Sequence, residues 1–167
     1  NYQALIALAR TKGTPLASLD DTTPEHVAQA MRDGIAIAEF PTTVEAATAL
    51  HAAGIRVLMG APNLVRGGSH TGNVATLDLA RAGVLDILSS DYVPASLLMA
   101  TLALPRLVPG IDLPAAVRMV TRTPAGAVGL TDRGEIAPGK RADLIRVHVA
   151  GDMAAVRNVW RRGERVA

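Results

Sequence analysis

Carboxylate and amide side chains follow four short apolar runs of this 167-residue chain. A carboxylate in such a place can accept a proton from water, coordinate a divalent cation or cap the next helix. For Asp91, in the segment SSDYVP at residues 89–94, all three roles are open. The polar residues that follow the runs are Asp20, Asp21, Glu39, Asn63 and Asp91.

The segment NLVRGGSHTGN at residues 63–73 offers a different chemistry, the binding of an anion. Arg66 supplies a planar fork of N–H donors that suits phosphate, and Ser69 and His70 add further donors. The paired Gly67 and Gly68 would let backbone N–H groups converge on an anion, close to the start of the next helix. A flexible loop that needs glycine for its turns explains the same residues, so both interpretations stay open at this stage.

The elements that position these residues recur along the chain. Each unit has a Thr or Asn near a helix start, an Ala-rich helix, a glycine and a short apolar run. Thr22 with Glu25, and Thr42 with Glu45, have the spacing of a capping box. Glycine after each helix predicts a left-handed residue at the helix end. These glycines are Gly34, Gly54 and Gly83.

The apolar runs do not alternate with polar residues, so we expect strands that are buried on both faces. Such strands, each followed by a helix, predict an α/β fold with a parallel sheet. Ligands bind beyond the carboxyl ends of the strands in such sheets, which is where the polar residues stand. The expected strands are residues 15–19, 35–38, 55–59 and 84–88, and the fourth helix is residues 94–104.

The pattern changes after residue 113. Helices are expected at residues 113–120 and 124–128, and strands at 134–136, 142–149, 155–160 and 164–166. We therefore divide the chain into an α/β part, residues 1–130, and a small β part, residues 131–167.

Composition narrows the classes of partner. Aromatic residues make up 2% of the chain and the formal net charge is +2, which disfavours base stacking and a nucleic-acid partner. No apolar run approaches the roughly 20 residues of a membrane span, and the absence of Cys suits a reducing compartment, so we expect a cytoplasmic protein. His26, His51 and His148 fall in expected helices or a strand and are interpreted as surface residues.

Five segments, taken together and in order, resemble the alpha-D-ribose 1-methylphosphonate 5-triphosphate diphosphatases. This is an amidohydrolase-superfamily family of the carbon–phosphorus lyase pathway. The tail at residues 124–144 is similar to the C-terminal signature of the broader superfamily. The five segments are residues 20–23, 38–43, 59–63, 66–70 and 89–95.

The resemblance implies a metal-dependent (β/α)8 barrel of the TIM type with a small β-domain. It implies hydrolysis of the substrate to the 5-phosphate and pyrophosphate. Asp91 would bind a divalent metal, zinc, and handle the proton of the attacking water. The residues implied to bind substrate are Asn63, Arg66, Gly67, Gly68, Ser69, His70, Asp20, Asp21, Glu39 and Tyr92.

The chain departs from the family pattern in two ways, and both concern expected metal ligands. The His-x-His pair of the first barrel strand is absent, and Leu19 stands where the family has a His that binds metal. Together with the start at Asn1, these features predict the C-terminal half of a barrel, inactive alone. Its outer strands would pair with a missing N-terminal half or with another copy in a homo-oligomer. Two alternatives are a hydrolase of cyclic amides or acylated amines, and a non-catalytic homologue that Leu19 would favour.

Overall fold

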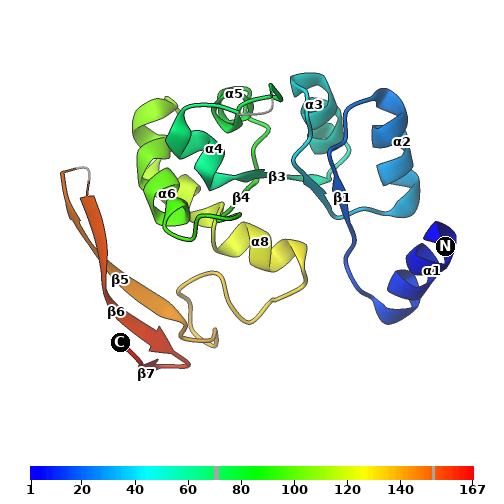
Figure 1. The fold of residues 1–167 in the computed structure, drawn as a ribbon. Helices are drawn as coiled ribbons and strands as arrows, with labels where there is room; N and C mark the ends of the chain where they lie inside the picture. The colour runs from blue at the N-terminus through cyan, green and yellow to red at the C-terminus, as the bar shows by residue number, and fades with distance from the viewer. Residues whose placement is uncertain (70–71, 152) are drawn as a thin grey trace.

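A parallel sheet of four strands organises the larger part of the molecule (Figure 1). The computed structural model describes residues 1–69, 72–151 and 153–167. Neighbours in the sheet follow the order of the chain, β1-β2-β3-β4, and all three pairs are parallel. The prediction of four consecutive parallel strands is therefore confirmed. The strands are β1 (Ala17–Leu19), β2 (Ile37–Glu39), β3 (Arg56–Gly60) and β4 (Ile87–Ser89).

Helices connect the strands and precede and follow them. The segment at 63–73, which we expected to be a loop throughout, is helical at its start because α4 extends to Arg66. Proline is common in the first turn of a helix and glycine just after its last residue, and Pro62 and Gly67 occupy these two places in α4. The helices are α1 (Tyr2–Lys12), α2 (Pro24–Asp33), α3 (Val44–Ala52), α4 (Ala61–Arg66), α5 (Thr76–Arg81), α6 (Ser96–Leu107), α7 (Leu113–Arg118) and α8 (Arg122–Ala127).

The helix caps lie one residue later than the capping-box spacing predicted. Thr23 caps α2, where its hydroxyl accepts from the His26 N–H, and Thr43 caps α3 in the same way. In α2, Pro24 fits this arrangement, because a proline without an N–H suits the first helical position. In α3 that position holds Val44, and Thr43 caps the helix all the same. The hydroxyls of Thr22 and Thr42 instead lie 2.7 Å apart and join the loops that follow β1 and β2. The glycine prediction is confirmed, with φ of 72° at Gly34, 80° at Gly54 and 72° at Gly83.

The two faces of the sheet differ in burial near β1, whereas at β4 both faces are buried, since Ile87 is 1% and Leu88 3% exposed. Ala38, Val57 and Met59 are at most 3% exposed and pack into one apolar cluster with the helices. Successive side chains alternate between faces, so Leu19 and its paired neighbour Glu39 lie on the opposite face. Leu19 is 63% exposed, so the expectation that both faces are buried is wrong for β1.

A second sheet of three antiparallel strands contains the C-terminal residues. Its order is β5-β6-β7, with β5 at Leu144–Ala150, β6 at Met153–Arg161 and β7 at Glu164–Arg165. The strand expected at 134–136 is wrong. Gly134 has φ of 94° and lies so close to α8 that an added Cβ would come 2.8 Å from the Arg122 Cα. The segment therefore turns against α8 instead of entering a sheet.

Asp86, just before β4, forms a polar hub at the amino-terminal edge of the parallel sheet. Its Oδ2 lies 2.9 Å from His51 Nδ1 and accepts the Val57 N–H at 3.0 Å. Its Oδ1 accepts from Arg56 Nη1 at 3.0 Å, and its side chain is 9% exposed. One carboxylate thus holds α3, β3 and β4 together, which the sequence did not predict.

None of the helices among the described residues is long and apolar enough to cross a bilayer.

Replacing Asp86 with Ala should lower the free energy of unfolding by about 2–3 kcal/mol, because the buried Val57 N–H is left without its acceptor and Arg56 and His51 lose a partner. Urea unfolding of the variant measures this change. Asp78 is the matched control, since its side chain is 56% exposed and 4.0 Å from Arg81. Its change to Ala should cost less than about 0.5 kcal/mol. Equal losses of unfolding free energy in the two variants would contradict the role of Asp86 in joining α3, β3 and β4.

Candidate active site

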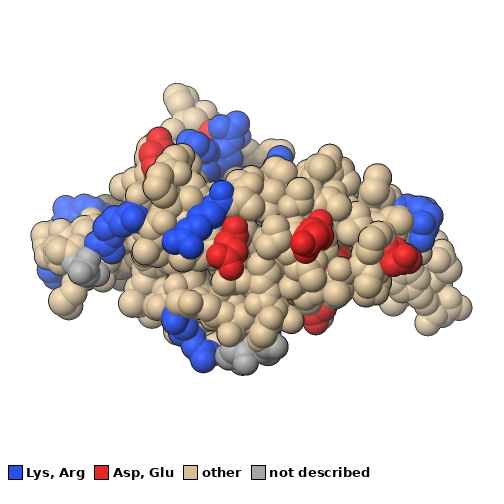
Figure 2. All heavy atoms as spheres, turned by 90° about the horizontal axis from the view of Figure 1, so that it is seen from above, with Lys and Arg blue, Asp and Glu red and all other residues tan. Residues whose placement is uncertain are grey.

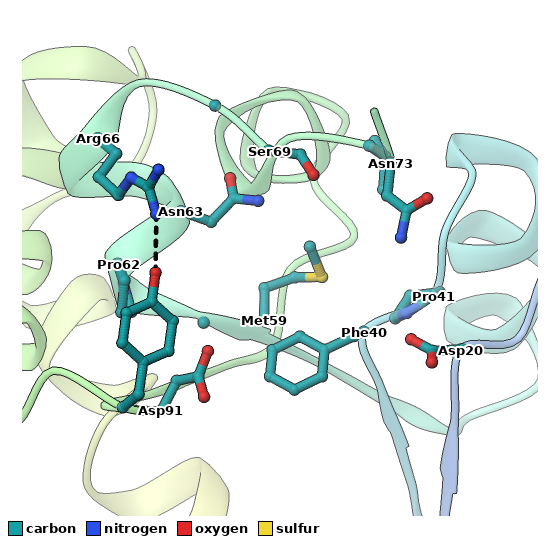
Figure 3. A pocket seen from close by; sticks show the side chains of 14 residues that line it. Asp20, Phe40, Pro41, Met59, Pro62, Asn63, Arg66, Ser69, Asn73 and Asp91 are labelled. Carbon is teal, nitrogen blue, oxygen red and sulfur yellow. Dashed lines mark hydrogen bonds between the residues drawn. The ribbon is translucent and has the colours of Figure 1, made fainter. Parts of the chain in front are cut away.

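A cavity of about 270 Å³ opens at the carboxyl-terminal edge of the parallel sheet (Figure 3). It gathers several of the expected site residues, which come from the ends of the strands, from α4 and from the segment that follows α4. Glu39, Asp21 and Gly67 do not line it, and His70 lies outside the described residues. The expected site residues that line the cavity are Asp20, Asn63, Arg66, Gly68, Ser69, Asp91 and Tyr92.

The backbone turns sharply where three of the strands end. Asp20, Phe40 and Asp91 have φ of 58°, 55° and 48°, a left-handed conformation that is uncommon for residues other than glycine. Before it turns, the sheet ladder continues by one bond, from the Asp20 N–H to the Glu39 carbonyl at 3.0 Å. The Phe40 N–H likewise donates to the Leu58 carbonyl at 2.9 Å. Such strained positions cluster at functional sites, and here all three residues line the cavity.

Gly60 at the end of β3 makes room for two of these side chains. A Cβ on Gly60 would lie 3.3 Å from Asp91 Oδ2 and 3.3 Å from Phe40 Cε1. The Asp91 carboxylate and the Phe40 ring therefore sit over the same bare stretch of backbone. Phe40 was not predicted as a site residue, although its place directly after a strand could have indicated it.

Donors for an anion project from α4. Arg66 Nη1 donates to the Tyr92 hydroxyl at 2.9 Å, which links α4 to the loop after β4. Asn63 Oδ1 accepts the Thr76 N–H at 2.9 Å. Because that bond fixes which end of the amide is the oxygen, the Asn63 Nδ2 group is the end that can donate to a ligand. Figure 3 shows Arg66 and Asn63 at the same side of the cavity.

The glycine pair does not act as we expected. The Gly67 N–H donates to the Leu64 carbonyl at 3.2 Å, and the Gly68 N–H donates to the Asn63 carbonyl at 3.0 Å. Both groups thus complete the C-terminus of α4, where Gly67 has φ of 84°. The prediction that these N–H groups converge on an anion is wrong, and side chains are left as the donors.

Two of the expected acidic residues lie outside the cavity. Asp21 is 6% exposed, and its carboxylate accepts a hydrogen bond from the Ser18 hydroxyl beneath the loop. Glu39 lies half-buried on the sheet face beside Leu19. Asp21 therefore stabilises the loop after β1, and Asp91 and Asp20 are the carboxylates of the cavity.

Charge on the face shown in Figure 2 has no single sign. Acidic side chains lie along the middle of the molecule, and Lys and Arg side chains gather toward its left side. A surface of mixed charge does not attract anions by its overall field. An anion in the cavity would therefore be recognised by individual donors such as Arg66.

The described residues do not make a metal site by themselves. They contain no group of three or more His, Cys, Asp or Glu side chains that could hold a metal ion. Leu19, at the position where a ligand was expected, has no donor atom, and one carboxylate such as Asp91 does not bind a catalytic metal alone.

Comparison with known proteins identifies the family. The model of the amidohydrolase family matches residues 7–167, so the chain belongs to this family, whose members are generally metal-dependent hydrolases. A relative, the alpha-D-ribose 1-methylphosphonate 5-triphosphate diphosphatase of Escherichia coli K12, is 52% identical over 167 residues. The match covers 99% of this chain and 44% of the relative. An imidazolonepropionase of Deinococcus deserti is 42% identical over 65 residues, which cover 34% of this chain and 16% of that protein.

Solved structures show the same fold. An amidohydrolase from Thermotoga maritima superposes with a TM-score of 0.70 at 20% identity, over 92% of this chain and 43% of that one. The ochratoxinase of A. niger superposes with a TM-score of 0.66 at 16% identity, over 96% of this chain and 43% of that one. The predicted fold class, part of a TIM-like barrel with strands of a small β-domain, is confirmed. The chain spans less than half the length of these relatives.

Replacing Gly60 with Ala should cost about 1 kcal/mol of unfolding free energy, because the new methyl group pushes on Asp91 and the Phe40 ring. Urea unfolding tests this expectation. Gly68→Ala is the control, since a Cβ there meets nothing within 4 Å, and it should leave stability unchanged. A Gly60→Ala protein as stable as the parent would show that the two side chains do not depend on the glycine.

Proposed function

We propose that the protein containing this chain hydrolyses alpha-D-ribose 1-methylphosphonate 5-triphosphate to the 5-phosphate and pyrophosphate. The observation that carries the proposal is the 52% identity to the E. coli diphosphatase across 99% of this chain. The cavity supports it, because cationic and amide donors on α4 lie across from the Asp91 carboxylate.

The reaction breaks one phosphoric anhydride bond. The oxygen of a water molecule bonds to phosphorus, the bridging oxygen leaves with pyrophosphate, and the water gives up a proton. In our proposal Asp91 accepts that proton, since a carboxylate beside the attacking water can act as a general base. Arg66 and the Asn63 amide hold phosphate oxygens, which fixes the phosphorus relative to Asp91.

The floor of the cavity offers an apolar surface for the sugar. Phe40, Pro41, Met59 and Pro62 all line the cavity, with Phe40 between Asp20 and Asp91 in Figure 3. A ribose ring has carbon-bound faces that can pack on such a surface while the phosphates reach the donors of α4. The arrangement therefore suits a molecule with one apolar ring and one strongly anionic tail.

The metal of the reaction requires more than the described residues supply. We propose zinc as the cation, with Asp91 as one ligand and the remaining ligands from outside the described residues. For this reason we expect these 167 residues to be inactive alone and the protein to act with further chain or as a homo-oligomer. We also propose that it works in the cytoplasm, with residues 1–130 in the barrel and 131–167 in the β-domain.

Asp91→Asn should lower the turnover number by about 100-fold or more while the KM changes little, because the amide keeps the shape but cannot take a proton and is a weaker ligand for the proposed zinc. The measurement is pyrophosphate release by the protein with all the sequence that its gene encodes. Asp78→Asn, on the exposed side of α5, is the control and should keep full activity. Unchanged turnover in Asp91→Asn would remove Asp91 from the mechanism.

Arg66→Ala should raise the KM for the triphosphate by about tenfold or more, because a charge-assisted contact with phosphate is lost. The KM of Arg66→Lys should lie between those of the parent and Arg66→Ala, because lysine keeps the charge but not the planar fork of donors. Arg81→Ala, on α5, is the matched control.

A second candidate function is hydrolysis of a cyclic amide or an acylated amine, which the similarity to an imidazolonepropionase favours. Turnover of such a substrate, unaffected by Arg66→Ala, would support this second candidate over the first.

A further inference from the structure

We propose that Tyr92 is a positioning residue, which holds Arg66 in place for phosphate without contacting the substrate itself. This inference rests on the proposed function, because it concerns the same phosphate-binding side of the cavity. The two residues are 26 positions apart in the sequence and come from different elements, α4 and the loop after β4. Their hydrogen bond is the dashed line in Figure 3, and both residues line the cavity.

The need for a positioning residue follows from the nature of the Arg66 side chain. Arg66 is exposed at the last position of α4, and a long exposed side chain samples many rotamers. A ligand that bound such a side chain would have to order it first. The bond from Arg66 Nη1 to the Tyr92 hydroxyl orders the guanidinium beforehand, so a phosphate meets donors that are already in place.

The chemistry of Tyr92 suits this role better than a carboxylate would. The guanidinium has five N–H donors, of which the phenol oxygen takes one, so the others can form a bidentate contact with phosphate. A phenol hydroxyl, unlike a carboxylate, does not form an ion pair with the guanidinium, so this hydrogen bond leaves the charge of Arg66 for a phosphate. Arg56 and Arg141 differ in this respect, because carboxylates lie 3.0 Å and 2.7 Å from their guanidinium nitrogens.

Asn63 provides a second donor that is fixed in the same way. Asn63 and Arg66 are three residues apart on α4, so their side chains lie on one face of the helix. The Thr76 N–H anchors the Asn63 amide oxygen from one side, and Tyr92 anchors Arg66 from the other. The two bonds preset a pair of donors for one phosphate group.

Tyr92 also connects this pair to the reacting centre. It follows Asp91 directly in the chain, so the position of Arg66 is tied to the position of the carboxylate. A phosphate ester or anhydride held by Arg66 would thereby present its phosphorus at a defined place relative to Asp91.

A double-mutant cycle with pyrophosphate as the probe tests the proposal. Calorimetry on the protein with all the sequence that its gene encodes would compare the parent with Tyr92→Phe, Arg66→Ala and both changes together. Tyr92→Phe should weaken pyrophosphate binding by about three- to tenfold, the effect of one lost hydrogen bond to a charged group. In the Arg66→Ala background the same change should have less than about a 1.5-fold effect, because the group that Tyr92 positions is gone.

The KM and the turnover number of Tyr92→Phe distinguish the loss of a positioning contact from a disturbance of Asp91. Tyr92→Phe should raise the KM for the triphosphate by the same factor as the loss in affinity, and should keep the turnover number within about twofold. The variant removes one oxygen from a side chain that is 59% exposed, so it should fold like the parent. Tyr2→Phe is the matched control, since Tyr2 donates to Asp33 on α2 and does not line the cavity.

Each other outcome overturns a specific statement. If Tyr92→Phe weakens pyrophosphate binding equally with and without Arg66, then Tyr92 contacts the ligand itself and the inference is wrong. If affinity is unchanged in Tyr92→Phe but falls in Arg66→Ala, the inference is wrong and the phosphate site of the proposed function stands. If Arg66→Ala also leaves affinity unchanged, the proposed phosphate site fails. A large fall in turnover in Tyr92→Phe would show that its hydroxyl acts on Asp91.

Discussion

The register of the parallel ladder determines where the cavity residues that follow the strands lie. Leu19 pairs with Glu39, Glu39 with Leu58, and Gly60 with Ser89, so the four strands end at nearly the same level. Parallel strands share one carboxyl edge, and each residue that follows a strand is therefore delivered to that edge. A shift of one residue in any pair would exchange the two faces of a strand and carry its terminal side chain away from the cavity.

At this carboxyl-terminal edge the left-handed turns are made by residues with large or charged side chains, which therefore reach the cavity. Glycine would adopt the left-handed conformation at little cost, yet two of these positions carry a carboxylate and one carries a phenyl ring. Glycine instead occupies the end of β3, where the carboxylate and the ring need space. The distribution of small and large residues along the edge thus favours a cavity over a tightly packed end of the sheet.

The repeated units were predictable from the sequence because their signals are local. Strand order, helix order and the glycine at each helix end depend on residues a few positions apart. The caps at Thr23 and Thr43 were missed by one residue, because each pair of adjacent threonines offers two similar caps. The function of Gly67 and Gly68 was misjudged, since the sequence does not show that a short helix precedes them. Asp86 and the Arg66–Tyr92 bond join distant elements, and composition and spacing contain no information about such contacts.

The loops at the cavity rim are connected by backbone bonds as well as by side chains. The Thr42 N–H donates to the Asp21 carbonyl at 3.0 Å, and the Val74 N–H donates to the Thr42 carbonyl at 3.0 Å. Together with the contact of the Thr22 and Thr42 hydroxyls, these bonds join the loops after β1, β2 and β3 into a continuous arc. In mechanical terms the arc is a stiff frame to which the loop after β4 is coupled through the side chains of Arg66 and Tyr92. A displacement of the Asp91 loop relative to this frame is therefore opposed by the Arg66–Tyr92 hydrogen bond.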